Sequence, residues 1–267
     1  MKTLIRISYL IAMLTLVSCL ISITNNNIYQ DGDWANAQWL GQDIVTLLLA
    51  LPLLLLSTNR GIKAGNWHWQ ILHAGILLYY FYTYSFFMFA ANLTVLYVFH
   101  LPIYGLASIG LVLDCIHLFN LKLDLVFSGR KLGSAIIVYL TFISLMITIL
   151  WFVDIYSHLT DPTHQSGTPT GEAPLIIYSL DLGLIIPLML TAAVLLYRHT
   201  KRGYLLTGII LVKTSTLGFA LMAMGLSMYV QDLNPEYYLI MLWSVIGLLG
   251  GWLAVSFLKN LSISTLP

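Results

Sequence analysis

The stretch LIIYSLDLGLIIPLMLTAAVLLYRHTKR, residues 175–202, decides the fold class of this chain. Between Leu175 and Tyr197 it carries a single charged side chain, Asp181, and a basic segment follows directly. A helix needs about 20 predominantly apolar residues to cross the hydrocarbon core of a bilayer, which is about 30 Å thick. The stretch is therefore predicted to be a membrane-spanning helix that ends at a basic loop.

The composition of the whole chain has the same character. Of its 267 residues, 59% are hydrophobic and 9% are charged, and the mean hydropathy is +0.86. A soluble domain carries about 25% charged residues, so this chain has too few to cover a surface in contact with water. The composition excludes a soluble, secreted or disordered protein. The net charge of +1 gives no electrostatic field that would attract nucleic acid, so we expect no nucleic acid as a partner.

Eight apolar runs are long enough to cross a bilayer, and the segments between them hold turn-forming and polar residues. The sequence therefore predicts an all-α fold, a single polytopic transmembrane helical bundle of residues 1–267, with the lipid bilayer as its main partner. The predicted spans are residues 4–23, 38–56, 70–91, 95–118, 134–155, 174–197, 204–229 and 238–258.

The positions of the basic residues orient this bundle. With eight spans, every Lys and Arg except Lys213 falls on one side of the membrane, and the loops on the other side carry acidic residues. Basic loops remain in the cytoplasm, so both termini are predicted to be cytoplasmic. The basic side has Lys2, Arg6, Arg60, Lys63, Lys122, Arg130, Lys131, Arg198, Lys201, Arg202 and Lys259, and the other side has Asp31, Asp33, Asp161, Glu172, Asp232 and Glu236.

The N-terminal run has a second interpretation. Lys2 and Arg6 precede an apolar segment that ends at Leu16-Val-Ser-Cys19, which is typical of a bacterial lipoprotein cleavage site. Cleavage there would leave a lipidated Cys19 and seven helices. The apolar run continues to Ile23, where a lipoprotein normally turns polar, so we expect an uncleaved signal-anchor helix.

The second and sixth spans share a pattern. Each has an acid near its outer end, Asp43 or Asp181, then a proline, Pro52 or Pro187, and then an Arg-Gly pair at its inner exit. The two spans are four helices apart and run in the same direction, which predicts a parallel four-plus-four repeat. The distance from acid to proline differs between the two spans, so chance similarity of apolar helices is the alternative.

Lys213 is predicted to lie near the centre of the seventh span. A lysine at that depth costs about 3 kcal/mol to insert, so it is expected to face the bundle interior and to have an acidic partner. Asp181 on the preceding span lies at a depth that the lysine side chain can reach, and we predict an Asp181–Lys213 ion pair. Such a pair either fixes the register of two helices or serves function, and the sequence leaves both open.

A second polar group lies near the outer ends of the predicted spans. Asp43, Asn92 and Asp154 lie there, and Tyr80 and Tyr84 share one face of the third span. One interpretation is an outward-opening polar cavity that leads toward the buried acid and lysine and attracts cations. The alternatives are structural, because Asp43 could cap a helix N-terminus and the tyrosines could simply fill the core.

Near the inner side lie His73, Asp114 and His117. Two imidazoles and one carboxylate could bind a metal ion, and a histidine among them could act as a general base. The spacing lacks a recognised metal motif, so a hydrogen-bonded structural cluster is the favoured interpretation, and we predict no cofactor.

Gly247 and Gly251 form a GxxxG pattern on the eighth span. Such a pattern predicts a face on which helices approach closely. The sequence leaves open whether this face packs within the chain or joins copies of the chain in a homo-oligomer.

Several of these segments together resemble a known group of proteins. They are Gly41-Gln-Asp43, the leucine run after Pro52, the Tyr-rich third span with Asn92, and the segments around Asp181 and Lys213. They resemble a family of bacterial multi-pass membrane proteins whose activity is uncharacterised. The resemblance implies a bacterial inner membrane location and transfers no catalytic role to any residue.

Two classes of function agree with these patterns. The favoured class is a transporter, channel or ligand-binding receptor for a small molecule or ion, which enters by an outward-opening polar cavity. The alternative is a membrane-embedded, metal-dependent enzyme that uses the inner histidine and aspartate cluster. The short loops argue against a large soluble catalytic apparatus, so an enzyme is the less favoured prediction.

Overall fold

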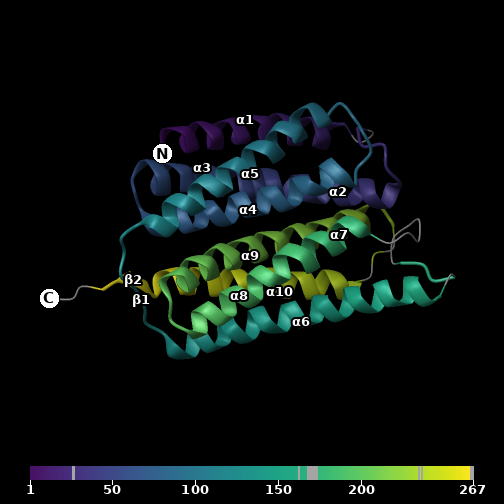
Figure 1. Cartoon of the computed structure of the whole chain (residues 1–267). Coiled ribbons are helices and arrows are strands. Elements are labelled where there is room, and N and C mark those ends of the chain that lie inside the picture. Colours follow the sequence, from purple (N-terminus) through teal and green to yellow (C-terminus); the bar gives the residue numbers. More distant parts are fainter. Residues whose placement is uncertain (26–27, 162, 167–173, 234, 236, 265–267) are drawn as a thin grey trace.

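The computed structural model describes residues 1–25, 28–161, 163–166, 174–233, 235 and 237–264, and these residues form an all-α bundle (Figure 1). Within the described residues, eight helices are long and apolar enough to cross a membrane. The predicted fold class and number of apolar helices are thus confirmed. The helices are α1 (Lys2–Thr24), the second helix (Asp33–Lys63), α4 (Trp67–Phe89), α5 (Tyr97–Asn120), α6 (Arg130–Thr160), the sixth helix (Leu175–Tyr197), α9 (Lys201–Val230) and α10 (Tyr237–Lys259).

π-helical segments divide the second and sixth helices. Pro52 and Pro187 each follow such a segment closely. Because proline lacks a backbone N–H and clashes with the carbonyl one turn before it, the preceding turn takes the wider π form. The second helix comprises α2 (Asp33–Val45), η1 (Thr46–Ala50), α3 (Leu51–Ser57) and η2 (Thr58–Lys63), and the sixth comprises α7 (Leu175–Leu180), η3 (Asp181–Ile185) and α8 (Ile186–Tyr197).

The two acids of these helices do not occupy equivalent positions. Asp181 is the first residue of η3, whereas the first residue of η1 is Thr46 and Asp43 lies a turn earlier, in α2. The π segments and the prolines are common to both helices. The four-plus-four repeat stays a prediction that rests on the prolines rather than on the acids.

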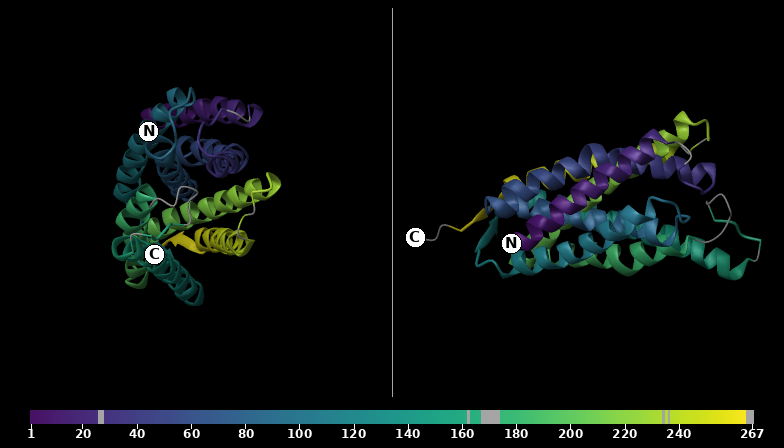
Figure 2. Two further views of the ribbon diagram at one scale, coloured as in Figure 1. Left: turned by 90° about the vertical axis from the view of Figure 1, so that its right-hand side faces the viewer. Right: turned by 90° about the horizontal axis from the view of Figure 1, so that it is seen from above.

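α4 and α9 are the most buried of the eight helices. Figure 1 shows α1 to α5 in one part of the bundle and α6 to α10 in the other, and Figure 2 views the same arrangement from two further sides. At the boundary between these two parts of the bundle, α2 and α4 both contact α9. The buried polar groups therefore lie mainly on these central helices or on helices that touch them.

Glycines bring α9 and α10 into close contact. An added Cβ on Gly218 would lie 2.6 Å from the Cα of Gly247, and one on Gly251 would lie 2.9 Å from Oγ of Ser215. The GxxxG face of α10 thus packs against α9 of the same chain, in the manner of small-residue contacts between membrane helices.

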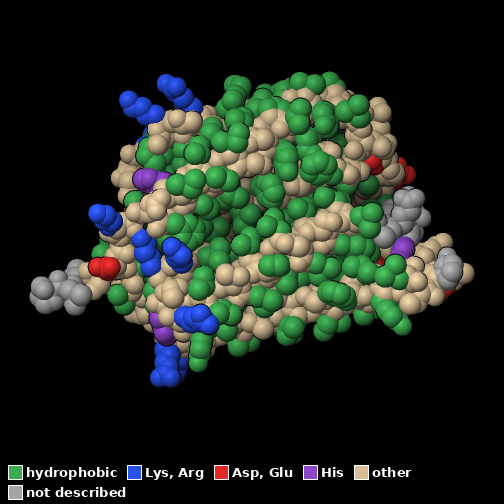
Figure 3. Space-filling view, in the orientation of Figure 1, with side chains coloured by type: hydrophobic (Ala, Val, Ile, Leu, Met, Phe, Trp, Pro, Cys, Tyr) green, Lys and Arg blue, Asp and Glu red, His purple; other side chains and the backbone are tan. Residues whose placement is uncertain are grey.

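The N- and C-terminal segments lie at the same end of the bundle (Figure 1), and the Lys and Arg side chains visible in Figure 3 gather there. We call this end, with the start of α1 and the finish of α10, the basic end. β1 (Leu125–Phe127) and β2 (Leu261–Ile263) pair there as an antiparallel ribbon. The opposite, acidic end includes the residues before α2 and after α6 and α9, with Asp31, Asp161 and Asp232. Glu172 and Glu236 lie outside the described residues.

Between the two ends, the face of the molecule seen in Figure 3 is largely apolar. A continuous apolar surface of this kind marks contact with an apolar environment or a partner, and it is compatible with a multi-pass membrane protein. Side chains that are at least 60% exposed include Leu48, Val98, Val138, Phe142, Leu248 and Trp252.

Candidate functional site

Asp43 is buried in the bundle, with 1% of its surface exposed. Its carboxylate accepts hydrogen bonds from the Ser22 hydroxyl at 2.5 Å and the Tyr29 hydroxyl at 2.6 Å, and from the Cys19 thiol at 3.7 Å. Cys19 and Ser22 share one face of α1 because they lie three residues apart. We call these four residues the Asp43 site.

The interpretation of Asp43 as a helix cap is wrong. α2 begins at Asp33 after its N-cap Gly32, so Asp43 lies in the helix interior. The polar residues before the apolar run are themselves helical, and the acidic side chain of Asp33 in the first turn interacts favourably with the helix dipole. Asp43 therefore points its carboxylate at other elements rather than at the backbone of its own helix.

Aromatic rings surround the Asp43 site. Tyr29 stacks on Phe87 with ring centroids 5.9 Å apart, and Trp39 lies 5.1 Å from Phe87. Tyr84 and His100 continue the cluster, with their centroids 5.5 Å apart. The Asp43 site is therefore joined through Tyr29 to a cluster of aromatic rings.

Three buried hydroxyls in this region, those of Thr15, Tyr80 and Tyr84, have no hydrogen-bond partner among the residues that the structure describes. Tyr80 and Tyr84 stack with ring centroids 5.7 Å apart, and the Tyr84 ring lies 5.5 Å from that of Phe87. A buried polar group without a partner costs roughly 1–3 kcal/mol. These hydroxyls give a polar character to the bundle interior beside the Asp43 site.

A groove of about 460 Å³ opens between α2 and α9 near the acidic end. Ser22 and Tyr29, which hold Asp43, form part of its wall. The wall carries hydroxyl and amide groups and no charged side chain, and it consists of Ser22, Asn25, Tyr29, Asn36, Leu40, Ile44, Ala223, Leu226, Ser227, Val230 and Gln231.

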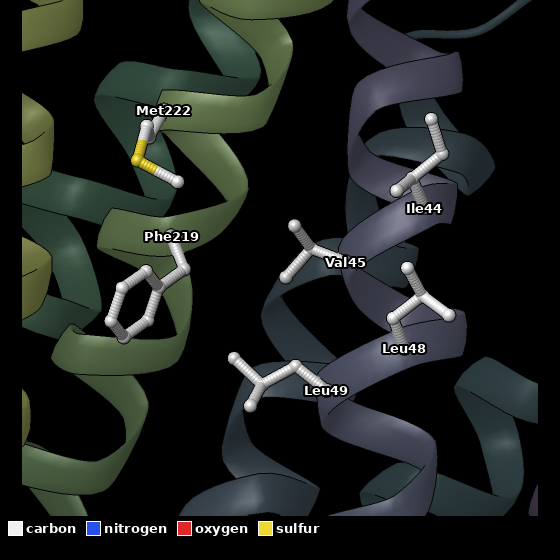
Figure 4. A pocket seen from close by; sticks show the side chains of 6 residues that line it. All are labelled: Ile44, Val45, Leu48, Leu49, Phe219 and Met222. Atoms are coloured by element: carbon white, nitrogen blue, oxygen red, sulfur yellow. The ribbon is translucent and has the colours of Figure 1, made fainter.

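A second cavity of about 210 Å³ shares Ile44 with this groove and continues beside η1. Its lining is apolar, and Figure 4 shows Val45 and Leu49 of the second helix facing Phe219 and Met222 of α9. The two cavities together follow the seam between the second helix and α9 from the acidic end inward.

Asp181 forms a second buried site, with 8% of its surface exposed. Its carboxylate accepts hydrogen bonds from the Tyr82 hydroxyl at 2.7 Å and from Nε1 of Trp151 at 2.9 Å. Nζ of Lys213, which is 1% exposed, lies 3.7 Å from the centroid of the Tyr82 ring. We call Tyr82, Trp151, Asp181 and Lys213 the Asp181 site.

The expected direct ion pair of Asp181 with Lys213 is not formed. Among the described residues, the ion pairs within 4 Å are His73–Asp114 and His164–Asp154. Instead, Tyr82 lies between Asp181 and Lys213. Its hydroxyl donates to Asp181, and the ammonium of Lys213 lies over its ring. A desolvated cation–π contact of this kind stabilises by about 2 kcal/mol. Tyr82 thus links Asp181 and Lys213 without a direct contact between them.

The two acidic sites lie on different faces of α4. Tyr82 contacts Asp181, whereas Tyr80 stacks on Tyr84, which packs against Phe87 beside Tyr29 of the Asp43 site. Neither of the two cavities along the α2–α9 seam is lined by these tyrosines or by Asp181. The groove reaches Ser22 and Tyr29 of the Asp43 site, and Asp181 is not part of its wall.

Asn92 and Asp154, the other predicted residues, both lie at the acidic end. The Asn92 backbone N–H donates to Asp31 at 3.0 Å, which ties the loop after α4 to the segment before α2. Asp154 on α6 contacts His164 and a short segment after the helix. Nearby, hydrogen bonds from the hydroxyl and backbone N–H of Thr163 hold the pKa of Asp161 below its usual range.

The inner cluster brings together two of its three predicted members. Nδ1 of His73 lies 2.6 Å from Asp114, whose other oxygen accepts a hydrogen bond from Gln70 at 2.8 Å. Nε2 of His73 lies 2.9 Å from Oγ of Ser8 on α1. His117 is not in this network, and His73, Asp114 and His117 do not form a three-ligand group within the described part of the chain.

Ser8, His73 and Asp114 follow the order of a nucleophile, a base and an orienting acid. The Ser8 hydroxyl, however, also donates to the Leu4 carbonyl at 2.9 Å. A hydroxyl that donates to a backbone carbonyl is not positioned to give its proton to His73. Each of these three side chains is fully buried, so the network holds α1, α4 and α5 together.

α1 contributes a row of buried polar side chains that no motif in the sequence indicated. Ser8, Thr15, Ser18, Cys19 and Ser22 are all buried, and they recur at spacings that place them on one helical face. Ser18 lies 3.0 Å from Nε2 of His100, in addition to the contacts of Ser8 and Ser22 described above. This stripe of small polar residues in an apolar helix was the signal that could have identified the Asp43 site.

Comparison with protein-family models gave no match, and neither did comparison with curated proteins or with solved structures.

Proposed function

We propose that this chain is a membrane transporter that binds a small organic cation in the groove leading to Asp43. In this proposal the acidic end faces outward and both termini are cytoplasmic, because basic segments stay on the cytoplasmic side of a membrane. The basic end carries the Lys and Arg side chains, and the groove opens near the opposite end.

One observation carries the proposal. Ser22 and Tyr29 line the groove and also donate hydrogen bonds to the carboxylate of Asp43. Rotation of one tyrosine side chain would therefore bring a ligand from the groove to a buried acid. Ionisable residues inside a membrane protein typically mark the path of a substrate or an ion.

The chemistry of the site favours a cation with an apolar body. The groove has a volume of about 460 Å³, within the usual range for small-molecule sites of about 300–1,000 Å³. Its wall is uncharged, and Tyr29, which donates to Asp43 behind the wall, packs against the rings of Trp39 and Phe87. A single positive charge would interact with Asp43 and with these rings, and the apolar part would remain in the groove.

Transport rather than binding alone is supported by the seam between the second helix and α9. The second cavity extends the groove beside η1. A π-helical turn is less regular than an α-helical one and often marks a functional position. A change of η1 to the α form would shift Ile44 and Val45 relative to Phe219 and so alter the width of the seam.

The proposal is tested by cysteine labelling in intact cells with a membrane-impermeant maleimide. Ser227→Cys, in the groove wall, is expected to react from outside, because the groove opens to the acidic end. Asn59→Cys at the basic end is expected to react only after permeabilisation. Leu248→Cys, on the apolar surface of α10, is the control for a lipid-facing position and should stay unlabelled.

The ligand class is tested on the same Ser227→Cys protein with phenethylammonium and its uncharged analogue 2-phenylethanol. The amine should slow labelling, the alcohol should not, and protection by the amine should be lost when Asp43→Asn is added. Equal rates with both compounds would contradict cation binding. Labelling of Asn59→Cys in intact cells would reverse the orientation.

A further inference from the structure

Three potential metal ligands converge at the acidic end, away from the α2–α9 groove. Asp154 and His158 lie near the end of α6, and His164 follows the helix. One ligand atom from each lies within 4.8 Å of the others. In the described part of the chain, no other three histidine, cysteine or acidic residues converge in this way.

The local sequence explains why these side chains meet. Asp154 and His158 are four residues apart, so they project from the same face of α6. The chain then turns back after Thr160 and brings Nε2 of His164 to 2.7 Å from Oδ1 of Asp154. The rings of His158 and His164 are perpendicular, with centroids 4.8 Å apart.

The second oxygen of Asp154 is held by neighbouring hydroxyls. Ser166 donates to Oδ2 at 2.7 Å, and Tyr178 of α7 donates to the same oxygen. These donors fix the orientation of the carboxylate and leave Oδ1 on the side of the histidines. Hydrogen bonds of this kind to a ligating carboxylate are a regular feature of metal sites.

The ligand types select the metal. Two imidazoles and one carboxylate suit zinc or another late divalent transition metal, whereas calcium and magnesium prefer oxygen ligands alone. Zinc bonds of about 2.0–2.1 Å place ligand atoms a little over 3 Å apart, which requires small adjustments from the distances seen here. His164 and Asp154 have 27% and 17% of their side chains exposed, so an ion can reach them from the solvent.

We propose that Asp154, His158 and His164 bind a zinc-class divalent metal ion, with water as the fourth ligand. The site is independent of the groove at Asp43. It is connected instead to the Asp181 site, because Tyr178 lies 5.4 Å from the Trp151 ring, and Trp151 donates to Asp181. A bound ion would thus fix the end of α6 against the sixth helix.

The test uses the full-length protein in detergent, purified with a tag that contains no histidine and stripped with a chelator. Zinc is then titrated calorimetrically, and bound metal is counted by mass spectrometry. The wild type should bind roughly one zinc ion per chain. His158→Gln and His164→Gln should each abolish this binding, and Ser166→Ala should weaken it by about tenfold.

His117→Gln is the matched control, because it changes a histidine of the inner cluster and should leave zinc binding intact. The unfolding of each metal-free variant is measured in parallel, so that loss of binding is assigned only to folded protein. Absence of zinc binding by the wild type would overturn the proposal. So would equal binding by His158→Gln and the wild type, or loss of binding in folded His117→Gln alone.

Discussion

Asp43 and Asp181 are both buried acids on helices that contain a π segment and a proline, yet their surroundings differ. Asp43 accepts three hydrogen bonds from uncharged groups and adjoins a groove. Asp181 accepts two hydrogen bonds, and Lys213 lies on the other side of the Tyr82 ring. The charge of Asp181 is therefore compensated within the protein, whereas that of Asp43 is not compensated by a described contact.

This difference separates a structural role from a binding role. An ionised acid in a medium of low dielectric constant needs a counter-charge, strong hydrogen bonds or a proton. Lys213 supplies the counter-charge at Asp181, so that site is complete without a ligand. Among the described residues, Asp43 has only hydrogen bonds, so in the proposed function a cation from the groove completes its site.

The largest difference is expected between Asp181→Asn and Asp43→Asn. Asp181→Asn keeps the size of the side chain but leaves Lys213 without a counter-charge, which should lower the free energy of unfolding by about 3 kcal/mol. Asp43→Asn removes a charge that has no basic partner and should cost about 1 kcal/mol or less. Chemical unfolding of both variants in the same detergent measures the two losses. Equal losses would remove the distinction between the sites.

A smaller effect is expected when the cation is removed as well. Lys213→Met in the Asp181→Asn background replaces the unpaired ammonium by an apolar chain of similar length. The double variant should recover about 2 kcal/mol of the stability lost by Asp181→Asn alone, since contacting charged groups are not additive. Unfolding free energies of both single variants and the double variant form the cycle. A double variant equal to the sum of the singles would show that Asp181 and Lys213 do not interact.

The smallest effect concerns the tyrosine between the two charges. Tyr82→Phe keeps the ring under Lys213 and removes the hydrogen bond to Asp181, so a loss of about 1 kcal/mol in unfolding free energy is expected. Tyr80→Phe is the matched control on the opposite face of α4. Its buried hydroxyl has no partner among the described residues, so its removal should not lower the free energy of unfolding and should raise it by about 1 kcal/mol. A larger loss of stability in Tyr80→Phe than in Tyr82→Phe would contradict the placement of these two tyrosines on opposite faces of α4.

Counting residues along the sequence predicts depth in the bundle well. The eight apolar helices, the burial of Lys213 and its proximity to Asp181 all follow from the length of apolar runs and the position of each charge within them. The depth of a residue rises by a fixed 1.5 Å per position in a helix. The depth of a residue can therefore be predicted without knowing which helices are its neighbours.

The direction in which a side chain points is harder to predict from the sequence. Tyr80 and Tyr82 are two positions apart, yet one lies near the Asp43 site and the other contacts Asp181. Which face of α4 meets which helix depends on packing across the whole bundle. For the same reason the sequence predicted a direct contact of Asp181 with Lys213 and did not place Tyr82 between them.

The polar stripe of α1 has a consequence for the order in which the chain assembles. Ser8 and Ser18 meet His73 and His100, which are 65 and 82 residues further along the chain. At a synthesis rate of about 5–20 residues per second, these histidines are synthesised roughly 3–16 s after their serine partners on α1. Hydroxyl groups tolerate this interval because they can bond to a carbonyl of their own helix, as Ser8 does to Leu4. Charged side chains have no such substitute, and the acids and histidines of these networks indeed lie on helices that are synthesised after α1.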